Sequence, residues 1–214
     1  MSTPNSERST VRRVPNRGIY DREKIYALLD KQFLCHTAIV HHGKPVVIPT
    51  MYGRIGDALY IHGSSLSRLT NELEKGIDVS VSVASVQGIV LARSAFHHSL
   101  NYESVVVFGK GKLVEGEEKL AALKAVSDQV LAGRWEEARL PNSGELKATK
   151  VIRIDMNEVS AKVRTGDPGD DKRDYDLDIW AGVLPIETSY GEPIVDPLLK
   201  EGVELAGSVR EVIK

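Results

Sequence analysis

Cysteine is almost absent from this sequence of 214 residues, and other features are missing with it. The single cysteine, Cys35, excludes an internal disulfide and any metal site built from several thiolates, and it suits a reducing compartment. No run of about 18 apolar residues is present, which excludes a membrane-spanning helix. Residues 1–13 lack the apolar segment of a secretory signal. We therefore expect a cytoplasmic protein.

An excess of charge of one sign is also lacking. The 28 Lys and Arg residues nearly balance the 30 Asp and Glu residues, and the formal net charge is -2. Without a basic surface, neither nucleic acid nor a membrane is an expected partner. Hydrophobic residues at 42% and charged residues at 27% are typical of a globular protein. We expect a flexible N-terminal arm (1–17), one main domain (18–187) and a C-terminal extension (188–214) packed on or near that domain.

Turn residues divide much of the chain into short, β-branched segments that predict strands. One pair flanks the turn His42-Gly43-Lys44 and predicts a hairpin, and a second pair is predicted across Gln87-Gly88. Closure of such antiparallel strands removes exposed edges, which favours a closed or split β-barrel of Greek-key type. The strands are expected at residues 35–41, 45–52, 58–62, 79–84, 89–92, 102–113, 149–156 and 159–164.

Three helices are expected outside the strands. Asp21 is a plausible N-cap for the first, and apolar residues recur after it at helical spacing. A short helix follows residues 63–65 and ends near Gly76, and a longer one covers residues 117–132 before Gly133. The fold class is therefore mainly β with peripheral helices, and the longest helix connects strands outside the barrel.

The segment from Ile61 to Leu69 is the strongest candidate for a binding site. It runs from a strand through a Gly/Ser loop into the start of a helix. Free N–H groups there, with the hydroxyls and the guanidinium, would form a compact cradle for a phosphate. An ordinary helix cap beside a surface arginine is the alternative. The side chains that would contribute are Ser64, Ser65, Ser67 and Arg68.

Two further segments carry candidate contacts. Pro49 interrupts a strand, and backbone groups left free there could bind the edge of a planar heterocycle, although such irregularities are often only structural. Residues 92–104 concentrate polar groups before a buried strand, where ligand contacts are common. His97 and His98 lie there, but adjacent side chains on an extended chain point in opposite directions. Since no carboxylate or cysteine stands at ligand spacing beside them, we expect no metal site.

Taken in order, these segments resemble the pyridoxamine 5′-phosphate oxidase-like, FMN-binding split-barrel superfamily. The resemblance is closest to its branch of flavin-nucleotide-binding proteins related to nitroimidazole-resistance proteins, and it covers residues 13–187. It rests on the order and spacing of residues 13–21, 45–52, 59–69 and 96–109, and of a late run from 164–168 through 178–185.

The resemblance implies a homodimer with FMN at two sites between the subunits. The Ser64, Ser65, Ser67 and Arg68 cradle would hold the FMN phosphate. The other contacts implied are Pro49, Thr50 and Met51 at the isoalloxazine edge, Tyr102 and Ser104 on a second flavin-contacting strand, and Trp180, which resembles the residue that approaches the flavin from the other chain.

The run Gly182-Val183-Leu184-Pro185-Ile186 departs from the pyridoxamine phosphate oxidases, which have an arginine–histidine substrate clamp after the tryptophan. An apolar run cannot grip a phosphate, so pyridoxamine phosphate oxidation is not expected. The leading hypothesis is an FMN-dependent oxidoreductase with a small nitro or quinone-like acceptor, in which His62 is the first candidate for a catalytic residue. The alternatives are a non-catalytic FMN carrier and a haem-binding barrel with His62, His97 or His98 as axial ligand.

Overall fold

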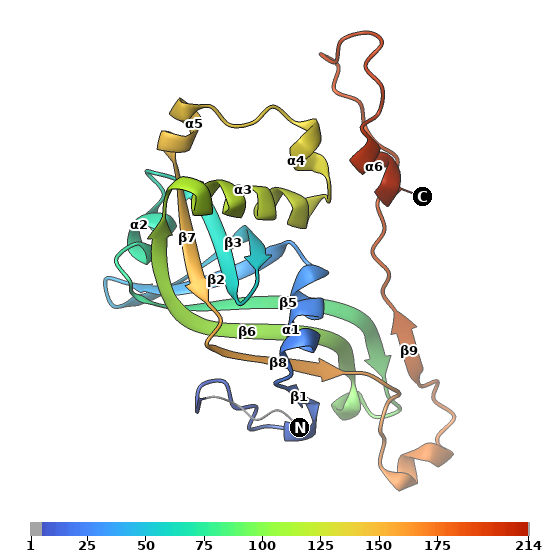
Figure 1. The fold of residues 1–214 in the computed structure, drawn as a ribbon. Helices are drawn as coiled ribbons and strands as arrows, with labels where there is room; N and C mark the ends of the chain where they lie inside the picture. The colour runs from blue at the N-terminus through green and yellow to red at the C-terminus, as the bar shows by residue number, and fades with distance from the viewer. Residues whose placement is uncertain (1–5, 214) are drawn as a thin grey trace.

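A computed structural model describes residues 6–213, and in this part of the chain one antiparallel sheet of nine strands forms the body of the protein (Figure 1). The strand order is β1-β8-β6-β7-β4-β3-β2-β5-β9, and β5 also pairs with β6. This extra pairing closes six strands into a barrel, which confirms the split-barrel fold. The strands are β1 (Gly18–Ile19), β2 (Leu34–His41), β3 (Lys44–Ile55), β4 (Ala58–Ser64), β5 (Asp78–Leu91), β6 (Ser99–Val114), β7 (Thr149–Asp155), β8 (Glu158–Arg164) and β9 (Gly182–Pro185).

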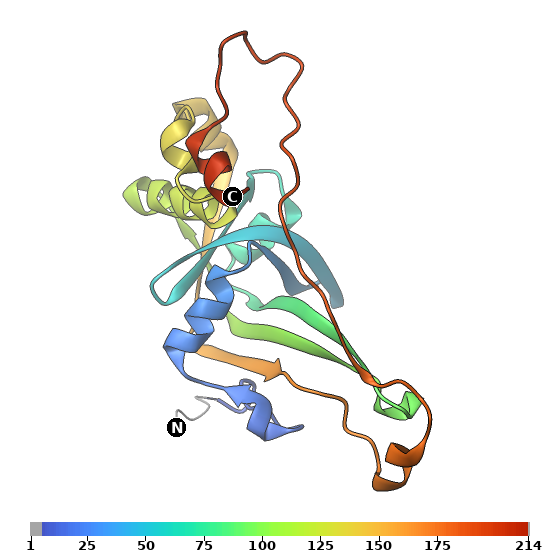
Figure 2. The same cartoon turned by 90° about the vertical axis from the view of Figure 1, so that its right-hand side faces the viewer.

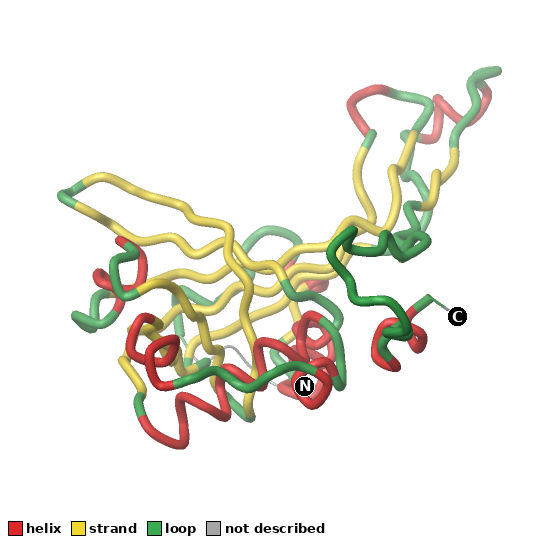
Figure 3. The backbone as a smooth tube through the Cα atoms, turned by 90° about the horizontal axis from the view of Figure 1, so that it is seen from above, coloured by secondary structure: helices red, strands yellow, loops and turns green. Residues whose placement is uncertain are grey.

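Helices lie around this sheet, and the C-terminal segment runs to one side of the strands (Figure 3). No helix in the part of the chain that the structure describes is both long enough and apolar enough to cross a membrane. The helices are α1 (Arg22–Asp30), α2 (Arg68–Leu73), α3 (Gly116–Val130), α4 (Arg134–Glu137), α5 (Ser143–Ala148) and α6 (Gly207–Val212), with short 3-10 turns at Pro15–Arg17, Ala95–His97 and Lys172–Asp176.

The β2–β3 hairpin forms as the sequence predicts. His42 and Gly43 have φ angles of 49° and 72°, so both turn residues are left-handed. A two-residue turn of this kind matches the right-handed twist of paired strands. The register pairs Leu34 with Met51 and Val40 with Pro45, which places these four residues on one face of the sheet.

The hairpin predicted across Gln87-Gly88 is wrong. β5 is one bent strand that pairs with β6 from Asp78 to Val90, and the register shifts between Val86 and Gly88. A β-bulge therefore replaces the expected turn, and it bends the strand without reversing it. A Cβ on Gly88 would lie 3.0 Å from Val183, so the glycine also lets β9 pair closely with this edge.

The helix α3 packs on the outside of the barrel, as predicted. Its Ala122 and Val126 are buried against β3, β4 and β7. The approach is closest at Gly53, where an added Cβ would lie 2.5 Å from the backbone nitrogen of Val126. A side chain at this position of β3 would push the helix away from the sheet.

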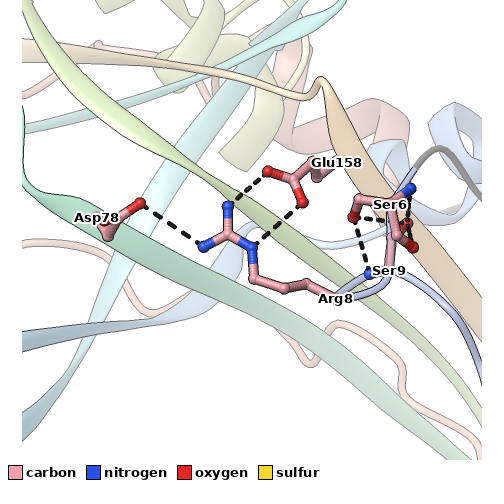
Figure 4. Close-up of polar contacts among 5 residues, drawn as sticks. All are labelled: Ser6, Arg8, Ser9, Asp78 and Glu158. Carbon is pink, nitrogen blue, oxygen red and sulfur yellow. Dashed lines mark hydrogen bonds and ion pairs between the residues drawn. The ribbon is translucent and has the colours of Figure 1, made fainter.

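The described part of the N-terminal segment lies against the sheet (Figure 4). The Arg8 guanidinium donates two hydrogen bonds to Glu158 at 2.5 and 3.2 Å and lies 3.6 Å from the Asp78 carboxylate. These contacts join the start of the chain to β8 and β5. Flexibility of residues 1–17 stays a prediction, and residues 1–5 lie outside the described part.

We expect acid to weaken the Arg8 contact. Its hydrogen bonds to Glu158 are the main reason that the pKa of this carboxyl falls from 4.5 to about 2. A lowered carboxyl pKa stabilises the folded state above about 4.5, and this stabilisation is lost as the pH falls toward about 2. The protection of residues 6–17 against hydrogen exchange, relative to the intrinsic exchange rate at each pH, should therefore fall across this range. In Arg8→Gln the protection should be low at every pH, and an Arg8→Gln variant that is protected like the wild type would contradict the expectation.

The C-terminal segment leaves the body after β9 and returns to it at α6 (Figures 1 and 2). β9 pairs with β5, and residues 186–206 then run past the sheet without a helix or strand. At α6, Ser208 donates from its backbone N–H and its hydroxyl to the Glu137 carboxylate, at 3.0 and 2.5 Å. The segment is thus held at both ends.

Candidate functional site

A pocket of about 530 Å³ lies between the sheet and the helices α3, α4 and α5. Its size is within the range of about 300–1,000 Å³ that small-molecule and cofactor sites occupy. Aliphatic residues of α3, of α5 and of the segment after α3 form much of its wall, and Trp135 of α4 adds an aromatic ring. Polar side chains, Ser127, Glu145 and Thr149 among them, complete the lining. Met51 and His62 of the sheet form its floor. The pocket therefore suits a largely apolar ligand.

His62 is the titratable residue that the sheet presents to this pocket. It follows Ala58 and Tyr60 on the face of β4 that α3 covers. Its Nδ1 is buried without a hydrogen-bond partner, and neither ring nitrogen has one within the described residues. An unpartnered buried polar atom costs about 1–3 kcal/mol. Burial also lowers the pKa of His62, so the ring is neutral and can offer a lone pair to a ligand.

Two arginines lie at the same pocket and offer positive charge to an anionic ligand. Arg134 Nη1 is 3.5 Å from Glu137, and its side chain keeps 45% exposure. Arg139 donates to both oxygens of Glu145, at 3.1 and 2.6 Å. Glu145 lines the pocket as well, so each arginine already has a carboxylate partner. The pocket as a whole suits a largely apolar ligand that the neutral His62 ring can contact.

The loop from Ser64 to Arg68 forms a tight turn in which the N–H groups predicted to be free are already bonded. The Ser65 N–H donates to the Ala148 carbonyl at 2.8 Å and the Leu66 N–H to the Ser64 hydroxyl at 3.2 Å, so the phosphate contacts that remain are side chains. The Ser64 carbonyl accepts bonds from the Ser67 N–H at 2.8 Å and from the Thr70 hydroxyl at 3.0 Å. Within the described residues, the hydroxyls of Ser65 and Ser67 make no hydrogen bond, and Ser67 caps α2 without using its side chain. Arg68 is exposed and forms no ion pair there. These groups can therefore receive an anion.

The three β3 residues predicted at a flavin edge divide between two environments. Pro49 and Met51 point outward and are exposed, whereas Thr50 lies between them opposite buried Cys35. Met51 also lines the His62 pocket. The structure thus brings Met51 and His62 together, a grouping that separate sequence motifs did not predict.

The other predicted contacts lie apart from this region within one chain. Tyr102 and Ser104 are on β6 opposite Val86 and Ala84, and the Ser104 hydroxyl donates to the Lys162 carbonyl at 3.1 Å. Trp180 is 68% exposed and precedes β9 in the chain. The strand β9 lies on the opposite side of Figure 1 from α2. No single chain gathers all the predicted flavin contacts into one site.

The other candidate axial histidines do not line the His62 pocket. The ring of His98 contacts the Ala92 carbonyl at 3.1 Å, and His97 lies 3.9 Å from Asp171. The Asp170 carboxylate accepts bonds from the backbone N–H groups of Arg93 and Ser94 and holds their loop. Among residues 6–213 no group of three or more metal-ligating side chains occurs.

Sequence reasoning missed the residues that α4 and α5 contribute. Arg134, Trp135 and Arg139 lie on or beside helices of four and six residues, which are too short for helical periodicity to show. One signal was available, because Asn142 and Glu145 form a capping box at the start of α5.

Comparisons with known proteins give relatives over most of the chain. The family model for pyridoxamine 5′-phosphate oxidase matches residues 21–163. A FAD and haem binding protein from Mycobacterium smegmatis is 36% identical, with a TM-score of 0.88 over 92% of this chain and 97% of that one. The flavocytochrome Anf3 from Azotobacter vinelandii is also 36% identical, with a TM-score of 0.90 over 97% of each chain.

A more distant structure agrees in fold alone. A candidate 5-nitroimidazole antibiotic resistance protein from Bacteroides thetaiotaomicron is 22% identical, with a TM-score of 0.54 over 68% of this chain and 86% of that one. No curated protein matches the sequence.

Proposed function

Because this chain belongs to the pyridoxamine 5′-phosphate oxidase-like, FMN-binding split-barrel superfamily, we propose that it is a flavoprotein that also binds haem. Two relatives at 36% identity, one named for FAD and haem and one named a flavocytochrome, support this pairing. The observation that carries the haem part is the unpartnered ring of His62 in an apolar pocket. Bound flavin supplies hydride or electron-pair chemistry, and haem iron supplies single-electron chemistry.

The flavin phosphate is proposed to bind at the Ser64–Arg68 loop. Sequence resemblance predicts FMN, but FAD contains the same riboflavin phosphate and extends it by an adenylate. A second pocket of about 600 Å³ adjoins Ser65, and its lining includes both lysines (Lys147, Lys150) and glutamates (Glu115, Glu117). This space beside the loop favours FAD. Chromatography of the flavin released by denaturation identifies the cofactor. Recovered FAD supports the assignment, and recovered FMN contradicts it. A flavin-free protein that binds neither added FAD nor added FMN would overturn the flavin proposal.

Replacing Arg68 with alanine should weaken flavin binding by about 10- to 100-fold, which corresponds to roughly 1.5–3 kcal/mol for a charge-assisted hydrogen bond. Arg68 is exposed and free of ion pairs within the described residues, so its loss should leave the fold unchanged. Flavin titration of the apoprotein measures the effect. Arg173→Ala is the matched control, because that side chain is 85% exposed and far along the chain from the loop. Equal flavin affinities in the two variants would show that Arg68 does not contact the flavin.

The haem is proposed to lie in the His62 pocket, where a ring nitrogen of His62 would bind the iron. The aliphatic residues of α3 would cover the macrocycle, and Arg134 and Arg139 would pair with its carboxylates. His97 and His98 do not line this pocket, which favours His62 among the three candidate ligands. Here His62 binds a cofactor and does not move a substrate proton.

We further propose that the protein is an oxidoreductase with a small nitro or quinone-like acceptor. The segment after Trp180 supports the exclusion of pyridoxamine phosphate, because it forms strand β9 and carries no side chain that could clamp a phosphate. Anaerobic mixing with NAD(P)H and a nitroaromatic acceptor tests the activity. Bleaching and reoxidation of the flavin support an enzyme, and an unreactive flavin would indicate a carrier.

A homodimer is proposed as the functional unit. The β2–β3 face, formed by Leu34, Val40, Val47 and Met51, exposes 47%, 63%, 59% and 41% of these side chains. A contiguous apolar face of this kind is typical of an interface. A second chain on this face would also supply the flavin contacts that lie apart within one chain, Trp180 among them.

A further inference from the structure

The segment of residues 186–206, here called the C-terminal arm, exposes an unusual number of apolar side chains. Ile194 is 98% exposed and Leu198 is 88% exposed, and Tyr190, Val195 and Val203 are each more than half exposed. Each Ile or Leu side chain gains free energy when it is removed from water, so an arm of this composition is expected to pack against a surface. Residues 6–213 of its own chain leave these side chains uncovered.

Both ends of the arm are fixed. At its start, Ile186 donates its N–H to the Gln87 carbonyl at 3.1 Å, beyond the β9–β5 pairing. At its end, Ser208 is buried and bonded to Glu137. Figure 1 shows the arm between these points, to one side of the sheet and of the helix α3. A segment held at both ends loses little conformational freedom on binding, which favours association.

The start of the arm adjoins the β2–β3 face. A cavity of about 780 Å³ is lined both by residues 186–190 of the arm and by Phe33, which directly precedes Leu34 of that face. The start of the arm therefore adjoins the apolar surface of β2 and β3. The rest of the arm leads away from that surface. Two copies of the chain related by a twofold axis could each cover the exposed surface of the other, because such an interface uses the same patches twice.

We propose that the C-terminal arm packs against a second copy of this chain and holds the dimer together. The inference rests on the proposed homodimer and names the segment that stabilises it. Directly after the arm, Ser208 bonds to Glu137, which follows Arg134 and Trp135 of the His62 pocket. The arm therefore connects the proposed subunit interface to the helices that cover that pocket.

A photo-reactive amino acid at Ile194 of the full chain tests the proposal. Irradiation of a mixture of isotope-labelled and unlabelled protein, with its cofactors bound, should give cross-linked peptides that join two different chains. The same amino acid at Lys24, an exposed residue of α1, controls for random collisions. Light scattering measures the molecular mass of each sample.

The outcomes separate the arm from the dimer. Dimeric protein with interchain links at Ile194 supports the proposal. If the protein is dimeric but the links at Ile194 stay within one chain, or are no more frequent than at Lys24, the proposed role of the arm is wrong and the proposed homodimer stands. A monomeric mass overturns both.

A substitution provides a second test. Ile194→Asp together with Leu198→Asp should weaken dimerisation by about 100-fold or more, because two exposed apolar contacts are lost and two charges must be desolvated. Glu201→Gln, also on the exposed arm, should leave the dimer affinity unchanged. An unaltered affinity in the double variant would contradict the proposal.

Discussion

Replacing His62 with alanine should abolish the Soret absorption of the purified protein while the flavin absorption remains. The variant removes the one ring in the pocket that can bind iron, and we expect the affinity for haem to fall by about 100-fold or more. The fold should survive, because the His62 ring makes no hydrogen bond within residues 6–213 and its removal leaves no partner unsatisfied. Haem titration followed by absorbance, with circular dichroism as a check on folding, measures both effects.

His97→Ala is the matched control for this experiment. That histidine lies outside the pocket, 3.9 Å from Asp171, and its loss should leave haem binding unchanged. Added imidazole should restore the Soret band in His62→Ala, because the small ligand can occupy the space of the missing ring. If His62→Ala retains full haem binding, or if His97→Ala loses it, the axial assignment is wrong.

Replacing Gly53 with alanine should strongly destabilise the fold, because Gly53 is where β3 approaches the backbone of α3 most closely. The new Cβ would lie 2.5 Å from the Val126 nitrogen and 2.6 Å from the Ala125 carbonyl carbon, and both are backbone atoms that cannot rotate away. Overpacking of this kind costs about 3 kcal/mol, which corresponds to a fall in melting temperature of roughly 6–12 °C in a chain of this length. Denaturant unfolding monitored by circular dichroism measures the change.

A displaced α3 should also disturb the His62 pocket, because Val126 lines it. We therefore expect Gly53→Ala to weaken haem binding as well as the fold. Gly169→Ala is the control, since an added Cβ there meets no atom within 4 Å and its backbone is not left-handed. Equal stability of the two variants would show that α3 is not seated on β3 as described.

Local features of the sequence were sufficient to predict much of the barrel. The β2–β3 turn depends on two adjacent residues, and the N-cap of α1 depends on Asp21, which accepts the Lys24 N–H at 3.0 Å. The bulge in β5 was not predictable in this way. Gln87-Gly88 has the composition of a turn, but the full-length pairing with β6 overrides it.

The candidate site was predictable only in pieces. His62 and Met51 stand out in the sequence separately, and nothing in their spacing shows that one pocket joins them. The walls come from α3, α4 and α5, some 60 to 95 residues later in the chain, so tertiary packing decides the site. The flavin contacts on β6 and at Trp180 depend in addition on a second subunit, and their roles stay predictions.

The burial of Cys35 gives the protein an internal reporter of strand opening. Its side chain has no exposure, and burial raises the pKa of the thiol to about 11. Since the thiolate is the reactive form, only about one molecule in 10⁴ would carry it at neutral pH, and no reagent can reach it in the closed barrel. The rate at which an alkylating reagent modifies this thiol therefore measures how often β2 separates from its neighbours, with no probe to introduce.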